Sequence, residues 1–361
     1  MSLDIARVRE QFPYLDQRIY LNTASTGISR RDAGAAAARF FDDMYSKGFD
    51  GRDLWRSVIG DVRVQVAHLA HVPAETVDFA GSTTDALNRL ALALPVSPGD
   101  RVVLCNDEFP SVQAVARLLA GRGATLVPVA VPEEVMRTEA LAEAARDSRI
   151  VLASHVHWET GTKLDLQVLS RASRDAGAFL IVDGIQALGA TPVEAGLADA
   201  YVGAVFKWLI SGFGLAVSIV APRLNEALNP VMRGYANPEP SRALSYSHVN
   251  YPGLVTLQDA LAYMEQIGWD AIYEHNAMLR THLRGALDDI GAGIATPEAA
   301  AAAITSIACA DPQGTAERLA ARGVSVEPRG RYLRVSPHFY NTEADIDRFC
   351  ELLRDIRKEQ A

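Results

Sequence analysis

The chain has 361 residues, of which 49% are hydrophobic, and carries a formal net charge of −9. That length suits two domains, or one large and one small domain, and the apolar fraction is ample for a sizeable core. No apolar run can span a bilayer, the acidic balance gives no electrostatic reason to bind nucleic acid, and three scattered cysteines match neither a disulfide framework nor a zinc-binding spacing.

The N-terminal segment Met1 to Asp16 is charged and lacks the apolar core of an export signal, so we expect a cytoplasmic protein. From about Val77 to Val220, short apolar runs alternate with amphipathic stretches. This predicts an α/β fold with a mainly parallel, helix-covered sheet. Pro128 places its strand at an edge or a bulge, because proline cannot donate a ladder hydrogen bond. The predicted strands are Arg101–Cys105, Thr125–Val131 and Ile150–Ala153, and the predicted helices are Val112–Leu119, Leu141–Ala145 and Leu166–Ala176.

The pattern changes after Arg223, where Pro230, Gly234, Pro238 and Pro240 mark a long connection. Leu254 to Leu287 then predicts helix with a break near Gly268, followed by a small α+β domain. The expected elements of this domain are a strand near Thr305–Cys309, a helix through Leu319, strands around Val324 and Leu333, and a closing helix from Asp345. We therefore expect residues 1–20 to join the small domain, 21–252 to form the large domain, 253–290 to form a connecting helix, and 291–361 to form the small domain.

A strand, a tight turn and a helix start follow one another near residue 80. A short strand runs into Gly81, and Ser82, Thr83 and Thr84 precede an apolar helical stretch. Backbone N–H groups, hydroxyls and the helix dipole can converge on an anion at such a turn. An ordinary Ser/Thr helix cap explains the segment equally well. A Walker loop is excluded, because no Gly-Lys-Ser/Thr follows.

A short, β-branched, apolar run from Phe179 ends abruptly at Asp183. This predicts a buried parallel strand with an acid at its carboxyl end, which is the edge where open α/β sheets bind ligands. A buried carboxylate needs a cationic partner, and the pyridinium nitrogen of pyridoxal phosphate would be one. Gln186, three residues on, could then reach the ring hydroxyl. The alternative for Asp183 is a helix N-cap.

Lys207 is the only charged residue in the apolar stretch from Tyr201 to Gly214. Lost hydration favours its neutral amine, which can attack a carbonyl and form a Schiff base. A lone lysine in such a stretch would more often snorkel out to solvent. The acid at Asp183 and the turn before it favour the chemical interpretation.

In this order and spacing, the three features resemble the class V aminotransferase family of fold-type-I pyridoxal phosphate enzymes, which includes cysteine desulfurases, kynureninases and isopenicillin N epimerase-like proteins. The resemblance covers nearly the whole chain, from Ile19-Tyr-Leu-Asn-Thr-Ala-Ser25 to Tyr332-Leu-Arg-Val-Ser-Pro-His-Phe-Tyr-Asn-Thr-Glu343. It implies pyridoxal 5'-phosphate held by Lys207 as a Schiff base, a large cofactor-binding domain, and a homodimer with shared active sites.

The resemblance also implies substrate-binding residues. Asn22 lies in what looks like the family's N-terminal pocket segment, and Trp158 lies where desulfurases carry an Asn near the ring, although a packed core tryptophan fits equally well. Arg334 lies in what resembles the substrate-arginine motif, where its guanidinium can hold an α-carboxylate in a bidentate pair. Arg329 and Arg331 compete for that role.

Further cofactor contacts follow from the same resemblance. Phe109 lies where many members stack a ring on the cofactor, and the alternative is a core phenylalanine at a strand end. His248 and Asn250 lie in a segment that resembles the one through which the neighbouring subunit reaches the phosphate. A surface loop histidine is the alternative for His248.

Two departures from the family pattern matter. Ala204 and Phe206 replace a serine and a histidine that many members place on the phosphate, so the Ser82–Thr84 turn and other donors must contribute more. The stretch from Val324 to Tyr332, where desulfurases carry their nucleophilic cysteine, has none. Persulfide chemistry is therefore unsupported by the sequence.

We expect an enzyme that acts on a small amino acid substrate, with Lys207 as general base and acid at Cα. Amino transfer ranks slightly first, with C–S or other β-elimination and epimerisation close behind. A protein that binds the cofactor but is catalytically silent remains an open alternative, and the motifs do not specify the substrate side chain.

Overall fold

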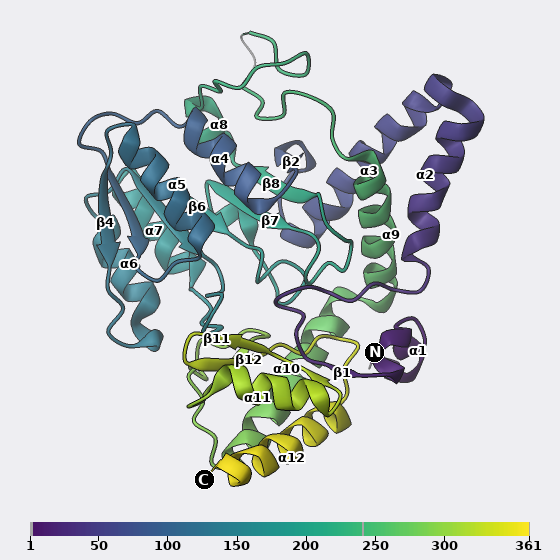
Figure 1. The fold of residues 1–361 in the computed structure, drawn as a ribbon. Helices are drawn as coiled ribbons and strands as arrows, with labels where there is room; N and C mark the ends of the chain where they lie inside the picture. Colours follow the sequence, from purple (N-terminus) through teal and green to yellow (C-terminus); the bar gives the residue numbers. More distant parts are fainter. Residues whose placement is uncertain (1–2, 240–241, 361) are drawn as a thin grey trace.

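A seven-stranded sheet forms the centre of the protein (Figure 1), whose computed structural model describes residues 3–239 and 242–360. Neighbouring strands are parallel except at β8, which runs antiparallel to both of its neighbours, β2 and β7. The predicted α/β fold with a mainly parallel sheet is therefore confirmed. In spatial order the strands are β2 (Val77–Ala80), β8 (Ala216–Val220), β7 (Ala200–Ala204), β6 (Phe179–Asp183), β5 (Ile150–Ser154), β3 (Arg101–Cys105) and β4 (Thr125–Val129).

Helices cover both faces of this sheet. Successive side chains of a strand point to opposite faces, and in these strands the side chains on both faces are apolar. In β3, Val102 and Leu104 belong to one apolar cluster, and Val103 and Cys105 belong to the other. Burial on both faces explains why such strands are continuous apolar runs in the sequence. One cluster joins the sheet to α4 (Thr83–Ala93), α5 (Pro110–Gly121) and α8 (Pro222–Ala227), and the other joins it to α3 (Arg52–Ala70), α6 (Arg137–Ala145), α7 (Leu166–Asp175) and α9 (Tyr251–Ile267).

A smaller antiparallel sheet lies in the C-terminal part of the chain, below the large sheet in Figure 1. Leu333 and Val335 enter the apolar cluster of this part, so the alternation along β12 turns Arg334 away from it. The strands are β11 (Glu327–Arg329), β12 (Tyr332–Val335) and β9 (Thr305–Ala308), and the helices packed with them are α10 (Trp269–Asp289), α11 (Pro312–Ala321) and α12 (Glu343–Gln360).

The N-terminal segment pairs with this C-terminal part. After α1 (Ile5–Arg9), β1 (Ile19–Tyr20) runs parallel to β10 (Val324–Ser325). Asn22 then forms an isolated bridge with Ser336. Segments at opposite ends of the sequence therefore lie side by side.

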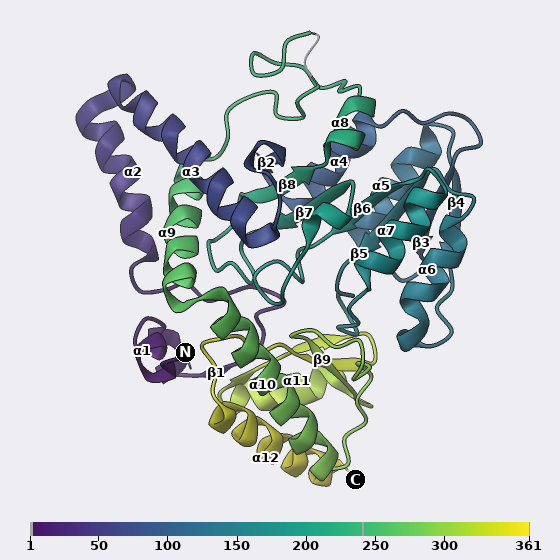
Figure 2. The same cartoon turned by 180° about the vertical axis from the view of Figure 1, so that it is seen from behind.

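An arm of two helices, α2 (Ala33–Lys47) and α3, projects from the sheet in Figures 1 and 2, and the sequence analysis predicted no element there. Large apolar side chains are exposed on and beside it, among them Phe41, Phe49 and Tyr45, which is 95% exposed. Contiguous exposed apolar groups mark interaction surfaces. None of the described helices is both long enough and apolar enough to cross a membrane.

Element boundaries differ from the predictions by a few residues. β4 ends at Val129 and lies at the sheet edge, which confirms the position expected from Pro128. The predicted break in the long helix is confirmed at Gly268, whose φ of +97° separates α9 from α10. Pro240, part of the predicted connection, lies outside the described residues.

Gly161 gives a test of the packing between the two parts. Its φ is +75°, and a Cβ there would lie 2.4 Å from the Ile304 carbonyl oxygen. Gly161→Ala should therefore lower the free energy of unfolding by about 2–5 kcal/mol through backbone strain and overpacking. In Gly177→Ala, the matched control, φ is +70° but no atom lies within 4 Å of the added Cβ, so the loss should be about 1–2 kcal/mol. Urea unfolding measures both variants, and equal losses would contradict the role of the close contact.

Candidate active site

One pocket lies at the carboxyl ends of β5, β6 and β7, the strands that end at Ser154, Asp183 and Ala204. Larger cavities lie beside β2 and beside Lys163, but neither contains the lysine and the acid predicted from the sequence. The predicted residues that line the pocket are Ser82, Thr83, Thr84, Phe109, Trp158, Asp183, Gln186 and Lys207, whereas Asn22, His248, Asn250 and Arg334 lie outside its lining.

Lys207 lies on the loop that joins β7 to β8, and only 8% of its surface is exposed. Its side chain therefore does not snorkel to solvent. Burial, reinforced by the charge of Arg334, lowers the pKa of Lys207 to about 7. Within the described ranges, no carboxylate lies close enough to form an ion pair with it. A substantial fraction of the amine is therefore neutral near pH 7.

The backbone around Lys207 is closely held. Gly27 N–H donates to the Phe206 carbonyl at 2.9 Å, and a Cβ on Gly27 would lie 2.1 Å from the Lys207 carbonyl oxygen. Only glycine permits this approach of the N-terminal segment. Ile210 has a φ of +48°, which for a β-branched residue costs about 1–3 kcal/mol. Surrounding contacts therefore keep this loop in a strained conformation.

Asp183 is buried at the end of β6. Its Oδ1 accepts the Ile185 N–H at 3.0 Å, so the side chain caps a tight turn and not a helix. Burial raises the pKa of this carboxyl, and the charge of Lys207 opposes the rise. No cation forms an ion pair with Asp183 in the part of the chain that the structure describes. A positively charged ligand group would supply the missing partner.

The Ser82–Thr84 turn is a helix cap and also part of the pocket lining. Ser82 Oγ caps α4, and Thr83 Oγ1 accepts the Ala204 N–H at 2.8 Å. Thr84 Oγ1 lies 2.8 Å from Oγ of Ser111, in the first turn of α5. Ser111 also lines the pocket, although the sequence analysis did not select it. The N-termini of two helices thus meet here, and their unpaired N–H groups favour an anion.

Two aromatic side chains form a wall of the pocket. The rings of Phe109 and Trp158 are 5.7 Å apart between centroids and nearly perpendicular. The indole N–H of Trp158 donates to the Asp107 carbonyl at 3.1 Å, which fixes the ring. Trp158 is therefore a pocket residue and not a fully buried core tryptophan.

An ionic network around the buried Arg137 supports this wall. Arg137 forms a bidentate pair with Asp107, at 2.8 and 2.6 Å, and a second pair with Glu134 at 2.8 Å. Ligand-type atoms of Asp107, Glu134 and His157 lie within 4.8 Å of one another. Because the guanidinium already forms ion pairs with both carboxylates, we interpret this cluster as an ion-pair network and not as a metal site.

Arg334 is only 2% exposed and has no ion pair with any described residue. Its Nη1 donates to the Trp158 carbonyl and its Nη2 donates to Ser25 Oγ, both at 2.7 Å, while its Nε has no partner. Burial lowers the pKa of Arg334 to about 10. Ser25, which the sequence analysis missed, thus orients a guanidinium that lacks a carboxylate.

The other two arginines and Asn22 are placed differently. Asn22 Nδ2 donates to Glu327 Oε2 at 2.9 Å, and the same carboxylate pairs with Arg329 at 2.9 Å. Arg331 is exposed. Among the three arginines that the sequence left in competition, Arg334 is the one that is both buried and without an ion pair.

His248 and Asn250 line a neighbouring cavity that reaches Gly81. Asn250 caps α9 by accepting the Gly253 N–H at 3.0 Å, so its side chain has a structural role within its own chain. His248 is exposed, with Nδ1 2.7 Å from the Tyr235 hydroxyl. It is therefore accessible to another chain.

The lowered pKa of Lys207 predicts a pH-dependent effect on stability without any added ligand. Between about pH 7 and the ordinary lysine value of 10.5, the unfolded chain binds a proton that the folded protein lacks. Lys207 therefore destabilises the fold most at or below pH 7, and this cost declines as pH rises. Lys207→Met should be more stable than the parent at pH 7, and the difference should shrink by roughly 2 kcal/mol at pH 9.

Urea unfolding of ligand-free protein at the two pH values measures this difference. Lys358→Met, at an exposed position in α12, is the matched control for the loss of a lysine. A stability difference for Lys207→Met that does not change with pH would contradict the lowered pKa.

Known proteins resemble this chain over nearly its whole length. The family model described as Aminotransferase class-V matches residues 19–349. An isopenicillin N epimerase from Streptomyces clavuligerus is 27% identical, with 94% of this chain and 95% of the relative covered, and a probable cysteine desulfurase from Methanothermobacter thermautotrophicus is 24% identical, with 97% of each covered. An apo cysteine desulfurase from Thermococcus onnurineus NA1 has the same fold, with a TM-score of 0.88, 19% identity and 99% of each chain covered. As the sequence motifs predicted, the chain belongs to the class V aminotransferase family.

Proposed function

We propose that this protein is a pyridoxal phosphate-dependent enzyme that transforms an amino acid at Cα. The observation that carries the proposal is that one pocket holds Lys207, whose pKa is lowered to about 7, together with the buried carboxylate of Asp183. A neutral amine can attack the carbonyl of the cofactor, and a carboxylate can pair with its pyridinium nitrogen. Membership of the family supports the same cofactor.

The pocket residues fit this cofactor in three places. Asp183, which has no cationic partner among the described residues, would pair with the ring nitrogen. Phe109 would stack on the ring face. The Ser82–Thr84 turn and the first N–H groups of α4 would hold the phosphate, with Ser111 as a further donor. These donors would offset the absence of side-chain donors at positions 204 and 206.

The residues of this chain would then divide the work on the substrate. When bound, the cofactor supplies a sink for the electrons left at Cα. Lys207 would remove and return the proton at Cα as general base and acid. Arg334, oriented by Ser25, would hold the α-carboxylate, and Trp158 would bound the space for the side chain.

Amino transfer, C–S or other β-elimination and epimerisation all begin with this proton removal, and we rank amino transfer first. The cysteines give no support to persulfide chemistry. Cys105 and Cys350 are buried, and burial raises the pKa of each thiol to about 12. Cys309 lies in the C-terminal part, with Sγ 3.4 Å from the Thr315 hydroxyl. None of the three lines the pocket.

The active unit in this proposal is a cytoplasmic homodimer with shared sites. The exposed side chains Phe41, Tyr45 and Phe49 offer an apolar surface to a second copy. The exposed His248 of the partner subunit would add a donor near the phosphate. Asn250 contributes less, because its side chain already caps α9.

Replacement of Arg334 tests the assignment of the substrate carboxylate. Loss of a buried, charge-assisted pair costs about 2–5 kcal/mol, so Arg334→Ala should weaken amino-acid binding by roughly tens- to thousands-fold. The cofactor should remain bound. Arg334→Lys should recover only part of the affinity, because an ammonium cannot form the bidentate fork.

Titration of the bound cofactor's visible spectrum with an amino acid, and with the amine that lacks its carboxylate, measures the effect. If the parent protein binds the two compounds equally well, Arg334 is not the carboxylate clamp.

The reaction itself is tested by incubating the protein with single amino acids, with and without pyruvate, and identifying the products by chiral chromatography and mass spectrometry. Formation of alanine and a 2-oxo acid only when pyruvate is present would support amino transfer. Pyruvate-independent release of ammonia would indicate β-elimination, and inversion at Cα would indicate epimerisation. Borohydride should first fix a pyridoxyl group on the Lys207 peptide.

Two outcomes would overturn this proposal. A pyridoxyl label on Lys163 instead of Lys207 would move the chemistry to another cavity. Bound cofactor without any product from the twenty standard amino acids or their D-isomers would favour a catalytically silent cofactor-binding protein.

A further inference from the structure

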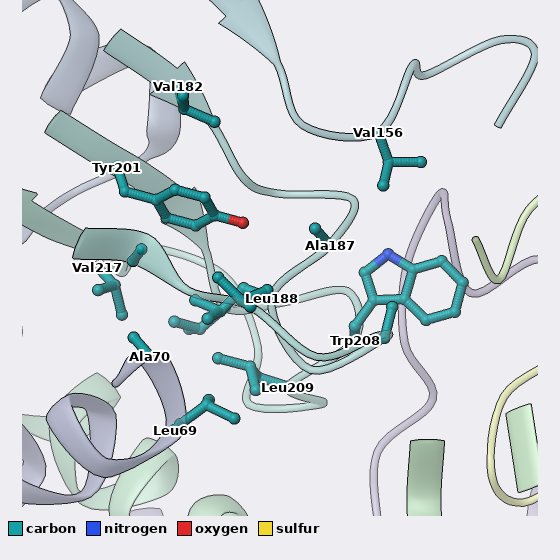
Figure 3. Close-up of a cluster of buried hydrophobic side chains, with 14 of the residues drawn as sticks. Leu69, Ala70, Val156, Val182, Ala187, Leu188, Tyr201, Trp208, Leu209 and Val217 are labelled. Atoms are coloured by element: carbon teal, nitrogen blue, oxygen red, sulfur yellow. The ribbon is translucent and has the colours of Figure 1, made fainter. Parts of the chain in front are cut away.

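A chain of hydrogen bonds runs from the C-terminal part of the protein to the floor of the pocket. Its members are Asn276 on α10, His338 after β12, Trp208 directly after the pocket lysine, and Gln186 after β6, and all four are buried. Figure 3 shows Trp208 in a cluster of buried side chains that includes Ala187, the neighbour of Gln186. The sequence analysis selected only Gln186.

Backbone carbonyl groups determine which atom donates in the hydrogen bonds of His338 and Asn276. The Trp208 carbonyl can only accept, so His338 Nε2, 3.0 Å away, carries a proton. Burial lowers the pKa of His338 to about 3, so the ring is neutral and Nδ1 is an acceptor. Asn276 Nδ2 donates to it at 3.3 Å, and to the Ala190 carbonyl at 3.0 Å. The backbone of Trp208 is therefore anchored from the C-terminal part.

Two constraints orient the Gln186 amide in the same sense. The indole N–H of Trp208 can only donate, so the amide atom that it meets at 3.0 Å is the oxygen, Oε1. The Ala24 carbonyl can only accept, so the atom bonded to it at 3.0 Å is Nε2. The second N–H on Nε2 has no acceptor among the described residues, and Gln186 lines the pocket. Gln186 therefore has an N–H donor left for a ligand in the pocket.

We propose that Trp208 is a positioning residue, whose indole N–H holds a donor of Gln186 against the phenolic oxygen of bound pyridoxal phosphate and so tunes the acidity of the Lys207–cofactor linkage. This inference rests on the proposed function. A donor stabilises negative charge on the phenolic oxygen, and that charge is fullest after the neighbouring linkage nitrogen has lost its proton. The Trp208–Gln186 pair therefore lowers the pH at which the linkage deprotonates.

The test is a pH titration of the visible absorbance of the cofactor-loaded protein. Trp208→Phe should raise the titration midpoint by about half to one pH unit, the size expected when one neutral hydrogen bond is weakened. Gln186→Leu should raise it at least as much, and the double variant should add little to Gln186→Leu, because both changes act through one interaction. Trp269→Phe is the matched control, since it removes an indole that stacks on Tyr273 and does not line the pocket.

An unchanged midpoint in Trp208→Phe, or fully additive shifts in the double variant, would overturn the inference. If Trp208→Phe does not fold, a benzothienylalanine residue at position 208 keeps the bicyclic shape without the N–H, and the same midpoint shift is expected. A parent protein that binds no pyridoxal phosphate would refute the proposed function, whereas binding with no shift would refute only the role of Trp208.

Discussion

Lys207, Asp183 and Arg334 are all buried, and none of them forms an ion pair with another described residue. A charge in such surroundings is costly unless it is neutralised or paired. Lysine can respond by losing its proton, and aspartic acid can respond by keeping one. Arginine does neither readily, so Arg334 depends on the Trp158 carbonyl and Ser25. The rest of the site holds these three groups in buried positions in which they form no ion pair within the described ranges.

The sheet edge, the lysine loop and the Arg137 network hold these groups in position. Parallel strands bring the ends of β5, β6 and β7 to one edge, and the contact of Gly27 with the lysine loop helps to hold that loop despite the strain at Ile210. Behind the aromatic wall, Arg137 and its two carboxylates form a network in which every charge is paired. Arg137 thus has carboxylate partners within the chain, whereas Lys207, Asp183 and Arg334 have no ion-pair partner among the described residues. Unpaired buried charges among paired ones are a physical mark of a binding site.

The sequence predicted the parts of the site that depend on local pattern. Asp183 and Lys207 could be predicted, because a charged residue that interrupts an apolar run can be recognised from the sequence alone. Ser25, Ser111 and Arg137 were not, because each acquires its role from a residue that is distant in sequence. The antiparallel course of β8 was also missed, since a strand buried on both faces has the same apolar pattern in either direction.

Thr83 illustrates a different limit. Its hydroxyl oxygen accepts the Ala204 N–H, a contact that no local motif reveals, and this bond leaves the hydroxyl proton for another acceptor. Similarly, the amide of Asn250 stabilises a helix start. Residue type and position can locate such groups, but only the tertiary structure says which of their hydrogen bonds are already used.

The pairing of β1 with β10 has a consequence for the order in which the protein acquires its binding functions during synthesis. Ser25 and Arg334, 309 positions apart, must meet to build the carboxylate-binding half, whereas the lysine-bearing pocket comes from a much earlier, more continuous stretch of chain. On a ribosome, the stretch that lines the lysine-bearing pocket can begin to fold while the last strands are still within the exit tunnel. The lining of the lysine-bearing pocket is therefore synthesised before the carboxylate-binding half can form, whereas the backbone of Trp208 gains its anchor on His338 only with the last part of the chain.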